Sequence, residues 1–203
     1  MDKFNRQYAA YIHDQIIKIV SDLITKECAI LDFGCGDGLL TYFMHNSFYK
    51  AQIFGIDSNE NLIENARKEF TSIVFNLVLD TTLPFADATF DLIYAVDVFH
   101  HIQPKDHAPY VSELLRVLKS DGRIILFEVN PYNPFAYIRF KKNPLEEEST
   151  LLLPSYASQL FKKNNCIVTL NYYFLSRFFP SWLQEYIHYV PCGSVYSVLV
   201  YKN

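Results

Sequence analysis

The stretch that most constrains the fold is residues 29–38, which read Ala-Ile-Leu-Asp-Phe-Gly-Cys-Gly-Asp-Gly. Three of the six glycines in the chain fall here, at alternate positions. The apolar residues before them predict a short buried strand that ends at Asp32, and residues 39–45 predict a helix. Glycines let a backbone approach a bound molecule, and a helix start offers unpaired N–H groups. Because an ordinary strand-to-helix turn needs only one glycine, this pattern predicts a ligand site.

The spacing of these glycines separates two kinds of cofactor site. A dinucleotide-binding fingerprint has the form Gly-x-Gly-x-x-Gly. Here the third glycine, Gly38, comes one residue early, and Leu39 stands where the fingerprint requires glycine. The spacing therefore disfavours an NAD(P)-dependent oxidoreductase, which stays as the second hypothesis.

Length, charge and cysteine usage narrow the class of protein. A chain of 203 residues, half of them apolar, predicts one globular domain. A formal net charge of −4 argues against nucleic acid as a partner. The four cysteines have no Cys-x-x-Cys spacing, which favours reduced thiols and a cytoplasmic location. We see no signal-peptide pattern and no apolar run long enough to span a membrane, so no transmembrane segment is expected.

Alternating strands and helices are predicted along most of the chain. After the first strand, strands are expected at residues 51–57, 72–79, 92–96, 123–128, 166–174 and 195–201. Helices are expected at residues 7–26, after Asp57, at 107–119, where residues 120–122 read as a stop signal, and at 150–163. This order predicts an α/β fold with a parallel, doubly wound sheet.

Asp57 closes the second predicted strand. A carboxylate at this end of a strand–helix–strand unit can accept hydrogen bonds from both hydroxyls of a ribose. The simpler interpretation is an acid that caps the next helix. The glycine-rich turn favours the ribose role.

Four segments, in the right order, resemble class I S-adenosylmethionine (SAM) dependent methyltransferases of type 11/12. They are residues 32–38, 55–57, 80–91 and 115–122. Residues 127–134 also resemble a subgroup that usually reads Phe-Glu-His-Asn-Pro and is often associated with polysaccharide or sugar biosynthesis. Val129 replaces the histidine of that motif.

The resemblance implies SAM as cofactor, S-adenosylhomocysteine as product and a small-molecule methyl acceptor as partner. The backbone of Gly34 and Gly36 would hold the methionine part, with Asp32 near its ammonium. Asp57 would bind the ribose, and Asp80 the adenine amino group. The residues implied to bind the cofactor are Asp32, Phe33, Gly34, Cys35, Gly36, Asp57, Ser58, Asp80, Thr81 and Asp97, the last beside the methyl donor.

The expected fold is a Rossmann-like three-layer α-β-α sandwich with a seven-stranded sheet in the order 3-2-1-4-5-7-6 and only the last strand antiparallel. An all-parallel six-stranded sheet would instead favour the oxidoreductase. Residues 1–203 would form one domain. It would comprise an N-terminal helical lid (1–27), a cofactor-binding core (28–128), and a substrate-side loop, helix and terminal strand pair (129–203).

Methyl transfer from a sulfonium needs no metal, so we assign no metal ligands; alignment dominates, with proton removal if the acceptor is a hydroxyl. Candidates for catalysis are His101, Glu128 and Asn130, with His100 beside them. The competing interpretation is that the two histidines cap or pack a loop and that Glu128 only holds the Asn-Pro loop.

Aromatic and basic residues outside the cofactor motifs indicate the acceptor. The cations Arg139, Lys141 and Lys142 accompany Tyr8, Tyr11, Tyr132, Phe178, Trp182 and Tyr186. This combination suits a sugar- or lipid-linked phosphate and allows peripheral membrane contact. Against this stand a plain solvated face for the cations, a core-covering helix for residues 178–190, and a non-catalytic methyltransferase-like binding protein.

Overall fold

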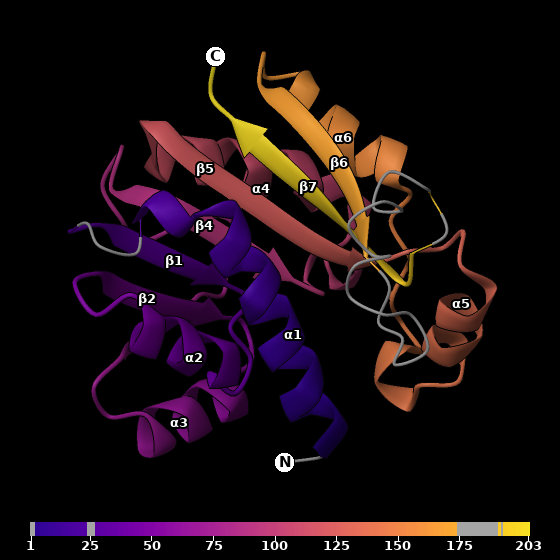
Figure 1. The fold of residues 1–203 in the computed structure, drawn as a ribbon, viewed down its shortest axis with the longest axis horizontal. Helices are drawn as coiled ribbons and strands as arrows, with labels where there is room; N and C mark the ends of the chain where they lie inside the picture. The colour runs from indigo at the N-terminus through magenta and orange to yellow at the C-terminus, as the bar shows by residue number, and fades with distance from the viewer. Residues whose placement is uncertain (1–2, 24–26, 174–190, 192) are drawn as a thin grey trace.

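The computed structural model describes residues 3–23, 27–173, 191 and 193–203. A seven-stranded sheet runs through the centre (Figure 1), in the order β3-β2-β1-β4-β5-β7-β6. The strands are β1 (Ala29–Phe33), β2 (Gln52–Asp57), β3 (Val74–Leu77), β4 (Phe90–Val96), β5 (Leu118–Val129), β6 (Ile167–Tyr173) and β7 (Val195–Tyr201). Only β7 runs antiparallel to its neighbours, β5 and β6, which confirms the predicted topology.

Helices cover both faces of the sheet (Figure 1). They are α1 (Lys3–Ile19), α2 (Leu39–Ser47), α3 (Glu60–Glu69), α4 (Pro104–Val117), α5 (Pro134–Lys141) and α6 (Pro154–Lys162), with short 3-10 turns η1 (Ser21–Leu23), η2 (Phe99–His101) and η3 (Pro144–Glu146). Helices α1 and α2 pack on one face in a cluster that includes Ile16 and Met44. Helices α4 and α6 pack on the other face through Leu114 and Phe161. These layers confirm the three-layer sandwich.

Alternation along the strands explains why both faces are covered. Ile125 and Phe127 of β5 point into the cluster beneath α1, and their neighbours Ile124 and Leu126 point into the cluster beneath α4. A parallel strand buried on both faces reads as a continuous apolar run, as this one does. The buried sheet fixes the strand ends, which carry the site.

Some predicted boundaries were wrong. The helix predicted over residues 107–119 ends at Val117, and Leu118 already begins β5. Gly122 is not a left-handed helix stop: a Cβ there would lie 2.8 Å from the Leu118 side chain and 3.0 Å from the Phe90 carbonyl oxygen. A close approach between β4 and β5, where the pairing register shifts, therefore accounts for this glycine.

The N-terminal helix ends earlier than predicted, at Ile19, and α5 was predicted only as part of a turn-rich segment. Asn133 caps α5 by accepting a hydrogen bond from the Ala136 N–H, and Pro134 follows at the first helical position. The aromatic helix predicted near residues 178–190, with Phe178, Trp182 and Tyr186, lies outside the described residues.

Candidate functional site

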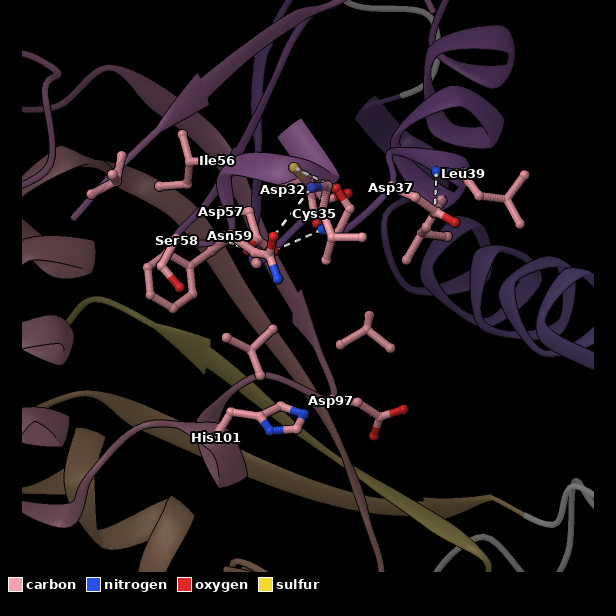
Figure 2. Close-up of a pocket in the computed structure, with 18 of the residues that line it drawn as sticks. Asp32, Cys35, Asp37, Leu39, Ile56, Asp57, Ser58, Asn59, Asp97 and His101 are labelled. Atoms are coloured by element: carbon pink, nitrogen blue, oxygen red, sulfur yellow. Dashed lines mark hydrogen bonds between the residues drawn. The ribbon is translucent and has the colours of Figure 1, made fainter. Parts of the chain in front are cut away.

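A cavity of about 610 Å³ opens where β1, β2 and β4 end. Its walls come from the glycine-rich loop after β1, the end of β2, the segment that follows β4, and Tyr8 of α1. Figure 2 shows the loop residues grouped with Asp57, and Asp97 and His101 set apart from them. Parallel sheets bind their ligands at this end of the strands.

The loop is held in an unusual backbone conformation. Gly34, Gly36 and Gly38 all have positive φ, at 78°, 55° and 81°. The N–H groups of Gly34 and Cys35 both donate to the Ile56 carbonyl, at 2.8 and 2.9 Å. A Cβ on Gly34 would lie 2.3 Å from Val98, whereas a Cβ on Gly36 would meet no atom within 4 Å. Gly36 therefore leaves an open cradle on the cavity wall.

Asp57 joins the loop to the end of β2. One carboxylate oxygen accepts the Gly36 N–H at 2.8 Å, and the other accepts the Asn59 N–H at 2.8 Å. The residue that caps α3 is Asn59, whose side chain accepts from the Leu62 N–H. Asp57 thus orders the loop and also faces the cavity.

Asp32 lies at the bottom of the cavity and is 2% exposed. Its Oδ2 accepts from the Thr41 hydroxyl at 2.6 Å and the Tyr94 hydroxyl at 2.9 Å. Burial raises the pKa of Asp32 to about 7, against the lowering effect of those two hydrogen bonds. Burial also raises the pKa of the Cys35 thiol, which keeps it protonated and unreactive. Phe33 and Ser58, also expected at the site, line the cavity.

Asp97 marks the end of β4 with a positive φ of 55°. Its carboxylate interacts with the buried Tyr8 hydroxyl, but neither its Oδ1 nor that hydroxyl makes a well-aligned hydrogen bond among the described residues. Burial, and then the charge of Glu128, raise the pKa of Asp97 to about 6, against the lowering effect of Tyr8. A buried carboxylate oxygen with so weak a partner at a cavity wall suits a polar or cationic ligand.

Asp80 and Thr81, also expected to bind the cofactor, are not among the residues that line the cavity. The Asp80 carbonyl accepts from the hydroxyl of the cavity-lining Tyr110 at 3.4 Å, and the Asp80 side chain accepts from the Thr82 N–H at 2.8 Å. An apolar wall is present instead, formed by Leu62, Val78, Ile102 and Tyr110. Sequence reasoning missed these four because each also fits the apolar pattern of its own helix or strand.

Of the three residues predicted to be catalytic, only His101 reaches the cavity wall. Its side chain is 47% exposed. Nδ1 lies 2.7 Å from the Ser149 hydroxyl, and burial lowers the pKa of the ring. A neutral imidazole at this place can accept a proton.

Glu128, the second candidate for catalysis, makes its contacts within the protein. It is 1% exposed and does not line the cavity. Its Oε1 accepts the N–H groups of Val98 and Phe99, and its Oε2 lies 2.5 Å from Nδ1 of His100. Burial lowers the pKa of His100, but the neighbouring carboxylates of Glu128 and Glu146 outweigh it and raise the pKa to about 10. Glu128 therefore positions the segment after β4.

Asn130, the third candidate for catalysis, also makes its contacts within the protein. It is fully buried, and its side-chain amide donates to the carbonyls of Gly193 at 2.7 Å and Pro191 at 3.2 Å. Its Oδ1 accepts the Tyr132 N–H at 3.1 Å. These bonds join the start of the 130–134 loop to the residues just before β7, and Asn130 does not line the cavity.

The N-terminal helix contributes little to the cavity. Ile12, Ile16 and Val20 are fully buried against the sheet, which supports a packed helix. Tyr8 and Ala9 line the cavity, whereas Tyr11 packs at the edge of the same core cluster.

The cavity fits the adenosyl and methionine groups that the sequence implied. The Gly36 cradle leaves room for backbone contact, the apolar wall suits a planar base, and the carboxylates of Asp32, Asp57 and Asp97 suit an ammonium, two hydroxyls and a sulfonium. The fit rests on shape and charge in this chain.

Comparison with known proteins agrees with this geometry. Residues 31–126 match the family described as methyltransferase domains. The ubiquinone/menaquinone biosynthesis C-methyltransferase UbiE of Desulfotalea psychrophila is 32% identical over 104 residues, covering 50% of this chain and 42% of that protein. The chain thus spans half or less of the length of the curated relatives it matches first.

Two solved structures show the shared fold. A SAM-dependent methyltransferase from Archaeoglobus fulgidus is 15% identical, with a TM-score of 0.71, over 96% of this chain and 94% of that chain. Geranyl diphosphate C-methyltransferase from Streptomyces coelicolor A3(2), in complex with Mg²⁺, geranyl diphosphate and S-adenosyl-L-homocysteine, is 14% identical, with a TM-score of 0.65, over 94% of this chain and 79% of that chain.

Proposed function

We propose that residues 31–126, which match the methyltransferase-domain family, form a class I SAM-dependent methyltransferase domain, and that the protein transfers a methyl group from SAM to a small-molecule acceptor. The observation that carries this proposal is the open backbone of Gly36, which faces the cavity while its N–H is held by Asp57. The NAD(P)-dependent oxidoreductase is disfavoured because the sheet has seven strands, with β7 antiparallel.

The chain's own residues would bind and orient the cofactor. Asp57 would accept the ribose hydroxyls with the lone pairs that Gly36 and Asn59 leave free, and Asp32 would face the ammonium. The apolar wall around Val78 and Tyr110 would pack on the adenine. When bound, SAM supplies a methyl group already activated on a sulfonium. Catalysis is then mainly alignment, with His101 as the cavity-lining candidate for proton removal.

The acceptor side carries an exposed surface of mixed character, which we name the α5 surface. Tyr132, Phe135, Tyr137 and Ile138 expose between 44% and 81% of their surface. Arg139, Lys141 and Lys142 are exposed on the same helix or directly after it. Apolar side chains beside cations suit an amphiphilic anion, so we propose an acceptor with a phosphate and an apolar tail.

Two further observations bear on this proposal. Geranyl diphosphate, which the Streptomyces coelicolor neighbour holds, combines an apolar chain with a diphosphate. In the described residues, no helix is both long and apolar enough to cross a membrane. The exposed apolar residues and cations of the α5 surface are where we propose that a lipid acceptor makes contact.

The test uses SAM labelled in its methyl group and a cell extract divided into chloroform-soluble and aqueous fractions. We expect label to enter a chloroform-soluble or phosphate-bearing product. Replacing Arg139, Lys141 and Lys142 together by Ala should raise the KM for that acceptor and leave S-adenosylhomocysteine affinity unchanged.

The double change Lys162→Ala and Lys163→Ala on α6 is the matched control, because it also removes exposed cations. Equal KM values in the triple and control variants would reject the phosphate contact. Absence of transfer to either fraction, with the cofactor bound, would favour the non-catalytic binding protein.

A further inference from the structure

Three side chains with metal-binding atoms converge beside the cofactor cavity. His100 and His101 come from η2, and Glu146 ends η3, 45 positions further along the chain than His101. Nε2 of His100 lies 3.2 Å from Oε2 of Glu146, and Nε2 of His101 lies 3.5 Å from the same oxygen. One possible ligand atom from each of the three residues lies within 4.8 Å of the other two.

Two of these atoms are buried and only poorly satisfied. Nε2 of His100 and Oε2 of Glu146 lie 3.2 Å apart, but this contact is not a well-aligned hydrogen bond, and neither atom makes one elsewhere among the described residues. The His100 side chain is fully buried. Buried polar atoms are normally well hydrogen-bonded, so the placement of these two atoms needs an explanation.

The remaining atom of each group is already held by a neighbour. Nδ1 of His100 lies 2.5 Å from Oε2 of Glu128, and Nδ1 of His101 lies 2.7 Å from the Ser149 hydroxyl. Oε1 of Glu146 accepts from the Asn143 side chain at 3.5 Å. In metal centres a carboxylate or another polar group on the far ring nitrogen fixes the tautomer and aims the other nitrogen at the ion. Here both imidazoles have that arrangement.

The backbone also holds the two segments together. The Thr150 N–H donates to the His100 carbonyl at 3.0 Å, and the Ser149 N–H donates to the Glu146 carbonyl at 3.1 Å. The donor atoms are therefore placed by the fold and do not depend on one long side chain.

We propose that His100, His101 and Glu146 bind a divalent transition metal ion, with Zn²⁺ the best match. Two imidazoles and one carboxylate form a donor set that Zn²⁺ takes, whereas Mg²⁺ prefers oxygen ligands. Ligand bonds of about 2.0–2.2 Å in a tetrahedron place neighbouring donor atoms roughly 3.3–3.5 Å apart, close to the observed spacings. Three protein ligands leave a fourth position open, as in catalytic zinc centres.

A second cluster, Asp97 with His100 and Glu128, has donor atoms at similar spacing. It is a poorer site because the direct contact between His100 Nδ1 and Glu128 Oε2 fills the space between them. His100 can use only its other nitrogen for a metal while this contact stands.

The position of the site suggests its role. His101 lines both the cofactor cavity and a smaller cavity of about 360 Å³ formed with Pro144, Glu147, Glu148 and Ser149. A metal here would join the segment after β4 to residues 144–150. Bound to a hydroxyl oxygen of the methyl acceptor, the metal would also lower the pKa of that hydroxyl. The hydroxyl would then lose its proton without His101 acting as the base.

The experiment measures metal binding without SAM or acceptor, so its outcome is independent of the proposed methyl transfer. Protein stripped with a chelator is titrated with ZnCl₂ by calorimetry and with CoCl₂ by visible absorption. We expect one ion per chain, a tetrahedral Co²⁺ spectrum, and a rise in Tm that the chelator reverses.

The variants Glu146→Gln and His101→Ala should each weaken Zn²⁺ binding by at least about tenfold, while Glu147→Gln, an exposed neighbour, should bind as the wild type does. Circular dichroism checks that each variant is folded. The proposal would be overturned if the wild-type protein bound no stoichiometric Zn²⁺. His100 would then be a protonated imidazole held between two carboxylates. Equal affinity in all three variants would overturn it as well.

Discussion

The cofactor end and the proposed acceptor end of the site are formed by different kinds of chemical group. At the cofactor end, backbone groups and short side chains form the cavity wall. Gly36 leaves open space there because it has no side chain, and Asp57 accepts its N–H. Near the ends of β4 and β5, where we propose the acceptor end, polar side chains bind groups of the protein itself: Glu128 binds His100, and Asn130 binds the carbonyls of residues 191 and 193. The first end is shaped to admit a ligand. The second is shaped to hold its own segments in place.

The difference between the two ends shows where the role of a side chain can be inferred from a sequence motif. The cofactor end needs a local backbone path, and positive φ at alternate residues permits little besides glycine. The acceptor end needs charge pairing between segments that only the fold brings together. A polar residue in such a region is as well explained by a buried partner as by catalysis.

The largest effect should come from the substitution Gly34→Ala. A left-handed backbone costs an L-residue roughly 1–2 kcal/mol, and overlap of the new methyl group with Val98 should add about 1–3 kcal/mol. Urea unfolding should therefore show a large loss of stability, and S-adenosylhomocysteine binding should be lost with the loop.

Gly36→Ala is the matched control, because it is the same change in the same loop with no atom within 4 Å of the new Cβ. It should lose only the backbone contribution to stability, yet bind S-adenosylhomocysteine poorly, because the methyl group points into the cradle. Equal stability losses in the two variants would remove the distinction between a packed and an open glycine.

The sequence predicted the sheet order because it follows from the succession of elements and the handedness of their connections. It predicted that the glycine-rich loop and Asp57 lie side by side because both belong to one strand–helix–strand unit. It did not predict that Leu62 and Tyr110 line the cavity, because these placements depend on packing between elements.

The pairing of His100 with Glu146 could not be read from the sequence either. The adjacent histidines were visible, but Glu146 lies in an acidic run with Glu147 and Glu148 that reads as solvated surface. Asn130 was a candidate for catalysis because its motif resembles a family pattern, and the sequence did not predict that its amide binds the Gly193 carbonyl just before β7.

A smaller effect tests Asp97, which stands at the border between the two ends. With its pKa raised to about 6, ionisation of this carboxyl should favour SAM, whose sulfur is cationic, over S-adenosylhomocysteine, whose sulfur is neutral. The preference for SAM should therefore increase as pH rises from about 5 to 7, as the carboxyl loses its proton.

In Asp97→Asn, the SAM-to-S-adenosylhomocysteine affinity ratio should fall by something on the order of tenfold at pH 7 and become independent of pH. Asp32 does not interfere with the comparison, because both ligands carry the ammonium that it would face. A ratio unchanged by the substitution would place Asp97 away from the methyl donor and assign it to the closed acceptor end.

The central claim, that the cavity beside the glycine loop is a SAM site, is tested most directly by isothermal titration of the wild type with S-adenosylhomocysteine and with NADH. We predict one S-adenosylhomocysteine per chain, no binding of NADH, and S-adenosylhomocysteine affinity weakened by about tenfold or more in Asp57→Ala, because the ribose loses a charged acceptor worth about 1.5–3 kcal/mol. Binding of NADH in preference to S-adenosylhomocysteine, or S-adenosylhomocysteine binding that Asp57→Ala leaves unchanged, would contradict it.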